Sequence, residues 1–264
     1  AIQKWGLHKR VALNILKFSG LNSRGIVASF MVASAVLSMW VMNTSTAIML
    51  LPVGISVIKV ISDTVNNVTE NQKFNFQLCL LLGIAYAASV GGIATPIGTS
   101  PNGVLIQFAS NNYDYDIGFA NWLSIGLPIT LGLGPLIWVF LTYFIFPVNF
   151  SANQESKNKL DSMLRELGPM SNEEKKVIVV FLITAFFWIF RQLIDDLPGL
   201  SLLDDSVIAI TGAVSLFFIN ENKSRNKLLV WDDVQTGFPW GLIFLFGGGM
   251  ALAFVVNDTG LALW

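Results

Sequence analysis

The chain has 264 residues, of which 53% are hydrophobic and only 12% are charged, and its formal net charge is −1 at pH 7. A soluble domain typically carries about 25% charged residues, whereas the mean hydropathy here is +0.62. These values exclude an ordinary soluble domain. They predict an all-α integral membrane protein, with the lipid bilayer and no nucleic acid among its partners.

Residues 1–24 form an amphipathic segment. Its apolar side chains recur at helical spacing among the basic side chains Lys4, His8, Lys9, Arg10 and Lys17. The segment is too charged to cross a bilayer, so we expect an interfacial helix on the cytoplasmic side.

Residues 25–61 are apolar but interrupted by the polar run from Asn43 to Thr46. A straight helix over this segment would be about 54 Å long, too long for a hydrocarbon core of about 30 Å. We therefore expect a re-entrant hairpin, with one arm ending near Val41 and the other starting near Thr46. Its polar tip would lie inside the membrane, where irregular backbone survives only against protein or a watery cavity.

Residues 62–76 are polar, and we expect a cytoplasmic loop there. Residues 77–111 are apolar again, but Thr95-Pro96 and the run from Gly98 to Gly103 interrupt them. Pro and Gly break helices, so we expect a broken transmembrane helix. Two such breaks in one chain are typical of a binding site at the mid-membrane depth of a secondary transporter.

The remaining segments alternate between apolar spans and polar loops. We expect a transmembrane helix over 118–148, a cytoplasmic loop over 149–174 and the start of a second structural repeat over 175–264. The 149–174 and 221–238 loops carry Lys and Arg, whereas 111–117 and 195–204 carry none. Because basic residues mark the cytoplasmic side, this alternation fixes the expected orientation.

The two interruptions contain only neutral polar side chains, with no Asp, Glu, Lys or Arg. Carboxamide and carbonyl oxygens suit a hard cation such as sodium, and the N-termini of half-helices favour anions. Together they predict a neutral site that holds an anion beside its own counter-cation. The single His and single Cys argue against an enzyme.

Three segments resemble the divalent anion/sodium symporter family, which includes dicarboxylate, citrate and sulfate carriers. Residues 38–52 resemble its first hairpin, residues 89–102 its broken helix and residues 240–249 a later glycine-rich span. The resemblance implies an inverted-repeat secondary transporter that couples sodium ions to a divalent anion, with a C4-dicarboxylate as the expected substrate. It also implies a homodimer in the cell membrane.

The resemblance implies two sets of site residues. A Ser-Asn-Thr triplet of the family touches sodium and a substrate carboxylate; Asn43 and Thr44 match its last two members, and Met42 stands in place of the Ser. Whether that position acts through its carbonyl or its hydroxyl stays open. The implied sodium ligands are Ser38, Met42, Asn43 and Gly98. The implied substrate-binding residues are Asn43, Thr44, Thr99, Ser100 and Pro101, with Ser100 replacing a family Pro.

Two alternatives remain at this point. A proton-coupled or oxyanion transporter of related hairpin architecture would share the Asn-Thr tip, and a membrane-embedded enzyme would need an ionisable or metal-binding constellation. Since the chain begins within an amphipathic stretch and ends after a glycine-rich helix, we expect a piece of a longer protein. That piece would lack the first spans and most of the second repeat.

Overall fold

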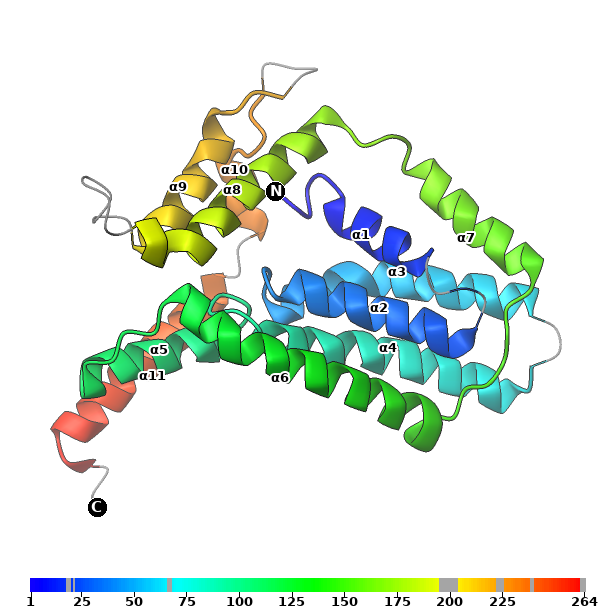
Figure 1. The fold of residues 1–264 in the computed structure, drawn as a ribbon, viewed down its shortest axis with the longest axis horizontal. Helices are drawn as coiled ribbons and strands as arrows, with labels where there is room; N and C mark the ends of the chain where they lie inside the picture. Colours follow the sequence, from blue (N-terminus) through cyan, green and yellow to red (C-terminus); the bar gives the residue numbers. More distant parts are fainter. Residues whose placement is uncertain are drawn as a thin grey trace. The chain divides into compact units, whose positions relative to one another are not determined.

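The computed structural model describes residues 1–17, 20, 22–65, 68–194, 204–221, 226–237 and 240–261. Every regular element within these ranges is a helix, apart from two isolated β-bridges (Figure 1). The all-α prediction is therefore confirmed for the described part of the chain. The helices belong to two compact units, residues 1–215 and 216–264.

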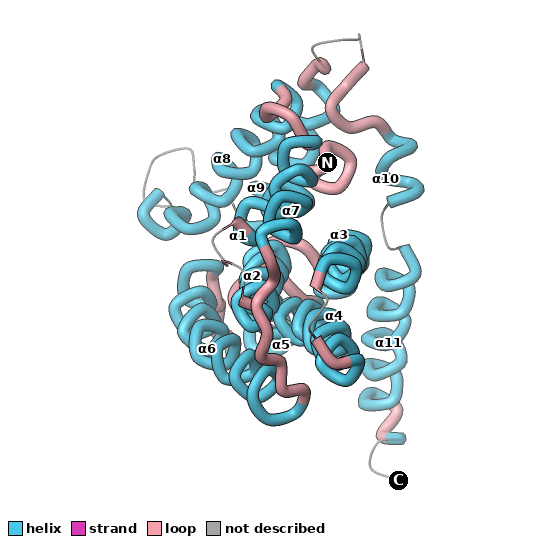
Figure 2. The backbone as a smooth tube through the Cα atoms, turned by 90° about the vertical axis from the view of Figure 1, so that its right-hand side faces the viewer, coloured by secondary structure: helices cyan, strands magenta, loops and turns pink. Residues whose placement is uncertain are grey.

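The first unit is built on a bundle of α1 (Leu7–Leu16), α2 (Ser23–Ser38), α3 (Asn43–Thr64) and α4 (Glu70–Ile93). The chain reverses between α2 and α3, so α2 and α4 run in one direction and α3 in the other (Figure 1). Figure 2 shows these helices nearly end-on. Apolar side chains fill the space between them: Ile26, Phe30, Leu50, Val57, Ile61, Phe76, Leu80 and Ile84.

The base of the α2–α3 hairpin, where α2 begins and α3 ends, lies against residues 150–153. The Ser23 N–H donates to the Phe150 carbonyl over 3.0 Å, and the Asn153 side chain donates to the Thr64 carbonyl over 2.7 Å. Asn153 also caps α7 (Gln154–Glu166). Both ends of the hairpin and the start of α7 are thus held at one end of the unit.

After α4 the chain turns over residues 94–99 and continues as α5 (Ser100–Tyr113). Next comes α6 (Phe119–Val139), which ends in the π-helical segment η1 (Phe140–Ile145). α6 runs along α4 and α2, because Thr130 Oγ1 donates to the Val90 carbonyl over 2.9 Å and Trp138 Nε1 to the Arg24 carbonyl over 3.0 Å. The helices α8 (Asn172–Ile194) and α9 (Asp205–Phe218) follow.

The second unit contains α10 (Trp231–Gly237) and α11 (Trp240–Asp258). A β-bridge pairs Asn220 with Lys227 near its start. The glycine run 247–249 lies inside α11 and does not interrupt that helix.

Several expected boundaries differ from the observed ones. The run from Asn43 to Thr46, expected to interrupt the helix, forms the first turn of α3, and the irregular residues are 39–42. The reason is that the first N–H groups of a helix need no intrahelical acceptor, so Asn, Ser and Thr are well tolerated there. Likewise α5 begins at Ser100, inside the run from Gly98 to Gly103 that was expected to interrupt the helix, since Pro is compatible with a first turn.

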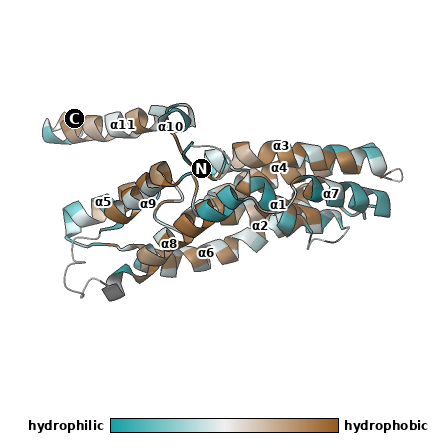
Figure 3. Ribbon diagram, turned by 90° about the horizontal axis from the view of Figure 1, so that it is seen from above, coloured by the Kyte–Doolittle hydropathy of each residue, from teal (hydrophilic) through white to brown (hydrophobic). Residues whose placement is uncertain are grey.

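The two segments expected to be loops also contain helix. The hydroxyl of Thr69 accepts from the Gln72 N–H over 3.3 Å, so α4 starts at Glu70 within the expected 62–76 loop. α7 occupies half of the expected 149–174 loop. It is polar on most of its surface, as its teal colouring in Figure 3 shows.

Three described helical segments are long and apolar enough to cross a membrane: α3, α4 and the combined α6–η1. α2 and α9 are apolar but shorter. Large apolar side chains point outward from these helices, among them Val32, Ile48, Ile55 and Leu131. Outward-facing apolar surface of this kind fits a helix bundle surrounded by lipid or by further apolar protein.

Candidate functional site

The tip of the α2–α3 hairpin contacts the break between α4 and α5 through the side chain of Asn43. The inward-facing terminal atom of this carboxamide lies 2.9 Å from Ser38 Oγ, 3.1 Å from the Gly98 carbonyl oxygen and 3.2 Å from the Ala88 carbonyl oxygen. These three oxygens come from the end of α2, from the break and from α4. Asn43 thus joins three elements at one point.

The two chain segments approach so closely at this point that no side chain fits at Gly98. A Cβ atom there would lie 2.5 Å from the Gly92 carbonyl oxygen and 2.9 Å from the Ser38 carbonyl oxygen. Real Cβ contacts essentially never fall below 3.0 Å. The carbonyl of Gly98 can therefore face Asn43 only because residue 98 has no side chain.

Polar side chains satisfy the backbone groups that the helix break leaves free. Asn102 Nδ2 donates to the carbonyls of Gly92 and Thr95, each over 2.8 Å, and Trp122 Nε1 donates to the Ile93 carbonyl over 2.9 Å. The hydroxyl of Thr95 donates to the Met39 carbonyl in the hairpin tip. These bonds hold an irregular segment in an apolar protein, where an unpaired carbonyl would be costly.

An aromatic cluster packs around Trp40 in the tip of the hairpin. The Trp40 ring lies nearly parallel to Phe119 of α6 and Trp188 of α8, with centroid distances of 6.0 Å and 6.5 Å, and edge-on to Phe181 at 5.0 Å. Stacked and edge-on pairs at these distances are favourable. Trp40 therefore ties the tip to two further helices.

The structure brings together three of the four predicted sodium ligands: Ser38, Asn43 and Gly98. Met42, the fourth, is the N-cap residue of α3, and its carbonyl accepts the Thr46 N–H over 2.9 Å. A carbonyl has two lone pairs, so one remains for another partner. The Met42 side chain has no hydroxyl to offer.

The predicted substrate-binding residues lie in the first turns of two helices. Asn43 and Thr44 open α3, and Ser100 and Pro101 are the first residues of α5. Thr99 is the N-cap residue of α5, and its side chain makes no capping hydrogen bond. Thr44 and Pro101 are exposed, whereas Thr99 and Ser100 are half-buried. The N-termini of α3 and α5 meet where Asn43 contacts Gly98, so two partial positive charges adjoin one site.

Two contributors were not predicted from the sequence: the Ala88 carbonyl and Gly92. A Cβ atom at Gly92 would lie 2.1 Å from a terminal atom of the Asn43 carboxamide, so this glycine makes room for the side chain. A backbone oxygen in mid-helix and a small residue leave no recognisable pattern in one sequence. Thr95, by contrast, lies in the helix break that the sequence predicted.

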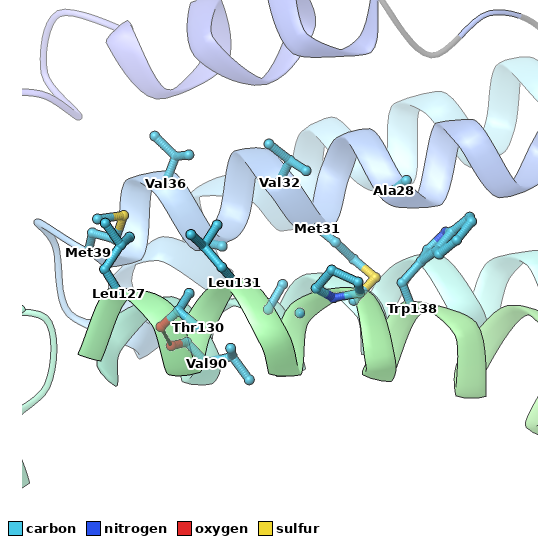
Figure 4. Close-up of a pocket in the computed structure, with 14 residues that line it drawn as sticks. Ala28, Met31, Val32, Val36, Met39, Val90, Leu127, Thr130, Leu131 and Trp138 are labelled. Carbon is cyan, nitrogen blue, oxygen red and sulfur yellow. Dashed lines mark hydrogen bonds between the residues drawn. The ribbon is translucent and has the colours of Figure 1, made fainter. Parts of the chain in front are cut away.

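An apolar cavity lies away from these residues. It occupies about 290 Å³ between α2 and α6, from Met39 at one end to Trp138 at the other (Figure 4). Its lining is apolar except for Thr130, whose hydroxyl already donates to Val90. It offers no free donor for an anion and contains none of the predicted site residues.

The chain matches known proteins over its whole length. Residues 1–264 match the family described as the sodium:sulfate symporter transmembrane region. The chain is 36% identical to a sodium-dependent dicarboxylate transporter SdcS of Staphylococcus saprophyticus and 34% identical to SdcS of Staphylococcus aureus strain USA300. Both alignments cover 100% of this chain and 51% of the relative, so the chain spans about half the length of these curated relatives. The chain accordingly belongs to the sodium:sulfate symporter transmembrane family, a family of multi-pass transporters and not of enzymes.

Proposed function

We propose that this protein couples sodium ions to the transport of a divalent anion across the cell membrane by alternating access, with a C4-dicarboxylate as substrate. The observation that carries the proposal is the contact of one carboxamide, that of Asn43, with both Ser38 and Gly98. The names of the two SdcS relatives, which call them sodium-dependent dicarboxylate transporters, support the choice of ion and substrate.

Sodium would bind among the neutral oxygens of Ser38, Asn43 and Gly98, with the Met42 carbonyl as a further ligand. A hard cation prefers such oxygens. No charged side chain belongs to this group, so the ion itself would bring the positive charge that the anion needs. Among the described residues, moreover, no three His, Cys, Asp or Glu side chains cluster to hold a metal ion.

The anion would bind at the first turns of α3 and α5. The first intrahelical bond of α3 runs from Thr46 N–H to Met42, which leaves the N–H groups of Asn43, Thr44 and Ser45 without an intrahelical acceptor. Such groups and the helix dipole favour a carboxylate. The hydroxyls of Thr44, Thr99 and Ser100 would complete this half of the anion site.

Since the chain spans half the length of its relatives, we propose that it contributes one half of a complete transport site. A second hairpin in the remainder of the protein would contribute the other half. We propose further that the protein is a homodimer. The hairpin base and the basic segment 149–174 lie at one end of the unit, which supports entry of the hairpin from the cytoplasm.

Transport by the full-length protein in proteoliposomes tests the proposal. Labelled succinate should accumulate when sodium is higher outside, and should not when potassium replaces sodium. Unlabelled malate should compete better than unlabelled sulfate. Uptake driven by a pH gradient without sodium would contradict the proposal and favour a proton-coupled transporter. Stronger competition by sulfate would change the substrate only.

A further inference from the structure

The Asn43 carboxamide has an inner and an outer terminal position. The inner position faces Ser38 Oγ and the carbonyl oxygens of Gly98 and Ala88, at 2.9, 3.1 and 3.2 Å, and the outer position faces only hydrogen-bond donors. Carbonyl oxygens can only accept hydrogen bonds. The two positions therefore require different atoms, depending on whether an ion is present.

Without an ion, the nitrogen belongs at the inner position. Nδ2 there donates to the surrounding oxygens, and Oδ1 at the outer position faces the donors. With Oδ1 at the inner position, the Ser38 hydroxyl can still donate to it over 2.9 Å. The carbonyls of Gly98 and Ala88, however, would face another oxygen with no proton between them. A cation among these oxygens removes that conflict.

We infer that the Asn43 carboxamide rotates when sodium binds, so that Nδ2 and Oδ1 exchange positions. Nδ2 faces inward in the ion-free protein, and Oδ1 faces inward in the sodium-bound protein. The inference rests on the proposed function. Nitrogen and oxygen of a carboxamide are nearly equal in size, so the turn needs no backbone movement. Gly92 leaves the space, because a Cβ there would lie 2.1 Å from the inner atom and 3.1 Å from the outer one.

The turn couples the two ligands through one side chain. In the sodium-bound orientation the outer position carries Nδ2, which then faces other donors. Only an acceptor between them, such as a carboxylate of the substrate, satisfies that arrangement. In the ion-free orientation the outer position carries Oδ1, which repels an anion. Sodium inside and the anion outside thus favour the same orientation, and each raises the affinity for the other.

Asn102 provides an internal control. Its side chain is buried, and its Nδ2 donates to two carbonyls of the helix break, Gly92 and Thr95, each over 2.8 Å. It contacts the same break as Asn43 but none of the oxygens around the inner position. Its orientation should not respond to sodium.

The experiment uses full-length protein with ¹⁵N-labelled asparagine side chains and follows the Nδ2 resonances by NMR. Comparison with Asn43→Asp and Asn102→Asp assigns the two resonances; where Asn43→Asp fails to fold, Ser38→Ala, which alters one contact, assigns Asn43 by its shift. We expect sodium, and not potassium, to move the Asn43 resonance. Its hydrogen exchange should become about tenfold faster as the inner hydrogen bonds are lost. The Asn102 resonance should stay in place.

Sodium-dependent thermal stabilisation is measured on the same samples. If sodium stabilises the protein but the Asn43 resonance and its exchange rate stay unchanged, the rotation is wrong while the proposed sodium coupling stands. If sodium produces no stabilisation and no spectral change, the proposed function fails, and the rotation fails with it. A shift of Asn102 as large as that of Asn43 would indicate a general rearrangement and would also overturn the rotation.

Discussion

At residue scale, the candidate site depends on two glycines that let another chain segment approach closely. Gly98 lies against the carbonyls of Gly92 and Ser38, and Asn43 fits only because Gly92 has no side chain. An added methyl group at Gly98 has to displace backbone, whereas one at Gly92 has to displace the Asn43 side chain. Overpacking of this kind typically costs about 1–3 kcal/mol.

Gly98→Val should therefore raise the sodium concentration needed for half-maximal uptake by roughly fivefold to a hundredfold. The substitution should change the choice of anion less than the sodium dependence, because Gly98 contributes a carbonyl and not a side chain. Gly103→Ala is the matched control, since a Cβ at this glycine of α5 has no neighbour within 4 Å. An unchanged sodium curve in a folded Gly98→Val protein would remove Gly98 from the ion site.

Sequence reasoning reached the site residues that lie in recognisable motifs but not the backbone oxygen that α4 contributes. Ser38, Asn43 and Gly98 belong to recognisable motifs, and the structure brings them together. The carbonyl of Ala88 could not be predicted, because every residue of a helix carries one and only the tertiary fold selects which oxygen is reached. The start of α3 at Asn43 could not be predicted either. The polar run could equally end one helix or begin the next, and only the tertiary fold decides between the two.

At the scale of elements, two contacts hold the α2–α3 hairpin and α1 in place. The first is the stacking of Trp40 on Phe119 and Trp188, which ties the tip to α6 and α8. The second joins α1 to the start of α8: Arg10 Nε lies 2.9 Å from Glu174 Oε1, with both side chains largely buried. The separation of 164 positions along the chain puts this pair beyond prediction from one sequence.

Trp40→Ala should lower the midpoint of thermal unfolding and reduce the extra stability that sodium gives, since the tip loses its support. Truncation of a buried Trp costs about 3–5 kcal/mol, and Trp40 is half-buried, so we expect a loss of about 2–3 kcal/mol. Trp231→Ala is the control, because Trp231 is 63% exposed. Equal melting temperatures for the two variants in detergent would contradict this role of Trp40.

The Arg10–Glu174 pair predicts an acid-sensitive contact outside the apolar spans. Burial raises the pKa of Glu174, but the hydrogen bonds and charge of Arg10, with the Ser171 N–H, outweigh it and lower the pKa below 4.5. A lowered pKa gives stability that is present above pH 4.5 and lost as the pH falls through the folded-state pKa.

Glu174→Gln should thus destabilise the protein at pH 7 by roughly 1–3 kcal/mol and flatten its loss of stability in acid. Glu155→Gln, which breaks the exposed pair of Glu155 and Lys159, should change stability by less than about 1 kcal/mol. Unfolding curves between pH 7 and pH 3 compare the two variants. Identical acid dependence in wild type and Glu174→Gln would show that this carboxylate does not act as described.

At the scale of the whole molecule, orientation and coupling decide the function. Asn158 on α7 and Asn112 on α5 are both exposed, whereas the single cysteine, Cys79, is buried. A cysteine at Asn158 should react with a membrane-impermeant thiol reagent only from the cytoplasmic side, and one at Asn112 only from outside. Labelling of Asn112→Cys that requires permeabilised cells would reverse the proposed topology.

In the proposed function, sodium provides the positive charge that lets a neutral site hold a divalent anion. Equilibrium binding of a labelled C4-dicarboxylate to the full-length protein, measured over a range of sodium concentrations, tests this claim directly. The affinity should rise about 5-fold to 150-fold with sodium, which corresponds to a coupling of about 1–3 kcal/mol, and potassium should have little effect. Asn43→Ala should abolish most of this rise. An affinity that is the same with sodium, with potassium and in Asn43→Ala would show that sodium does not provide this charge.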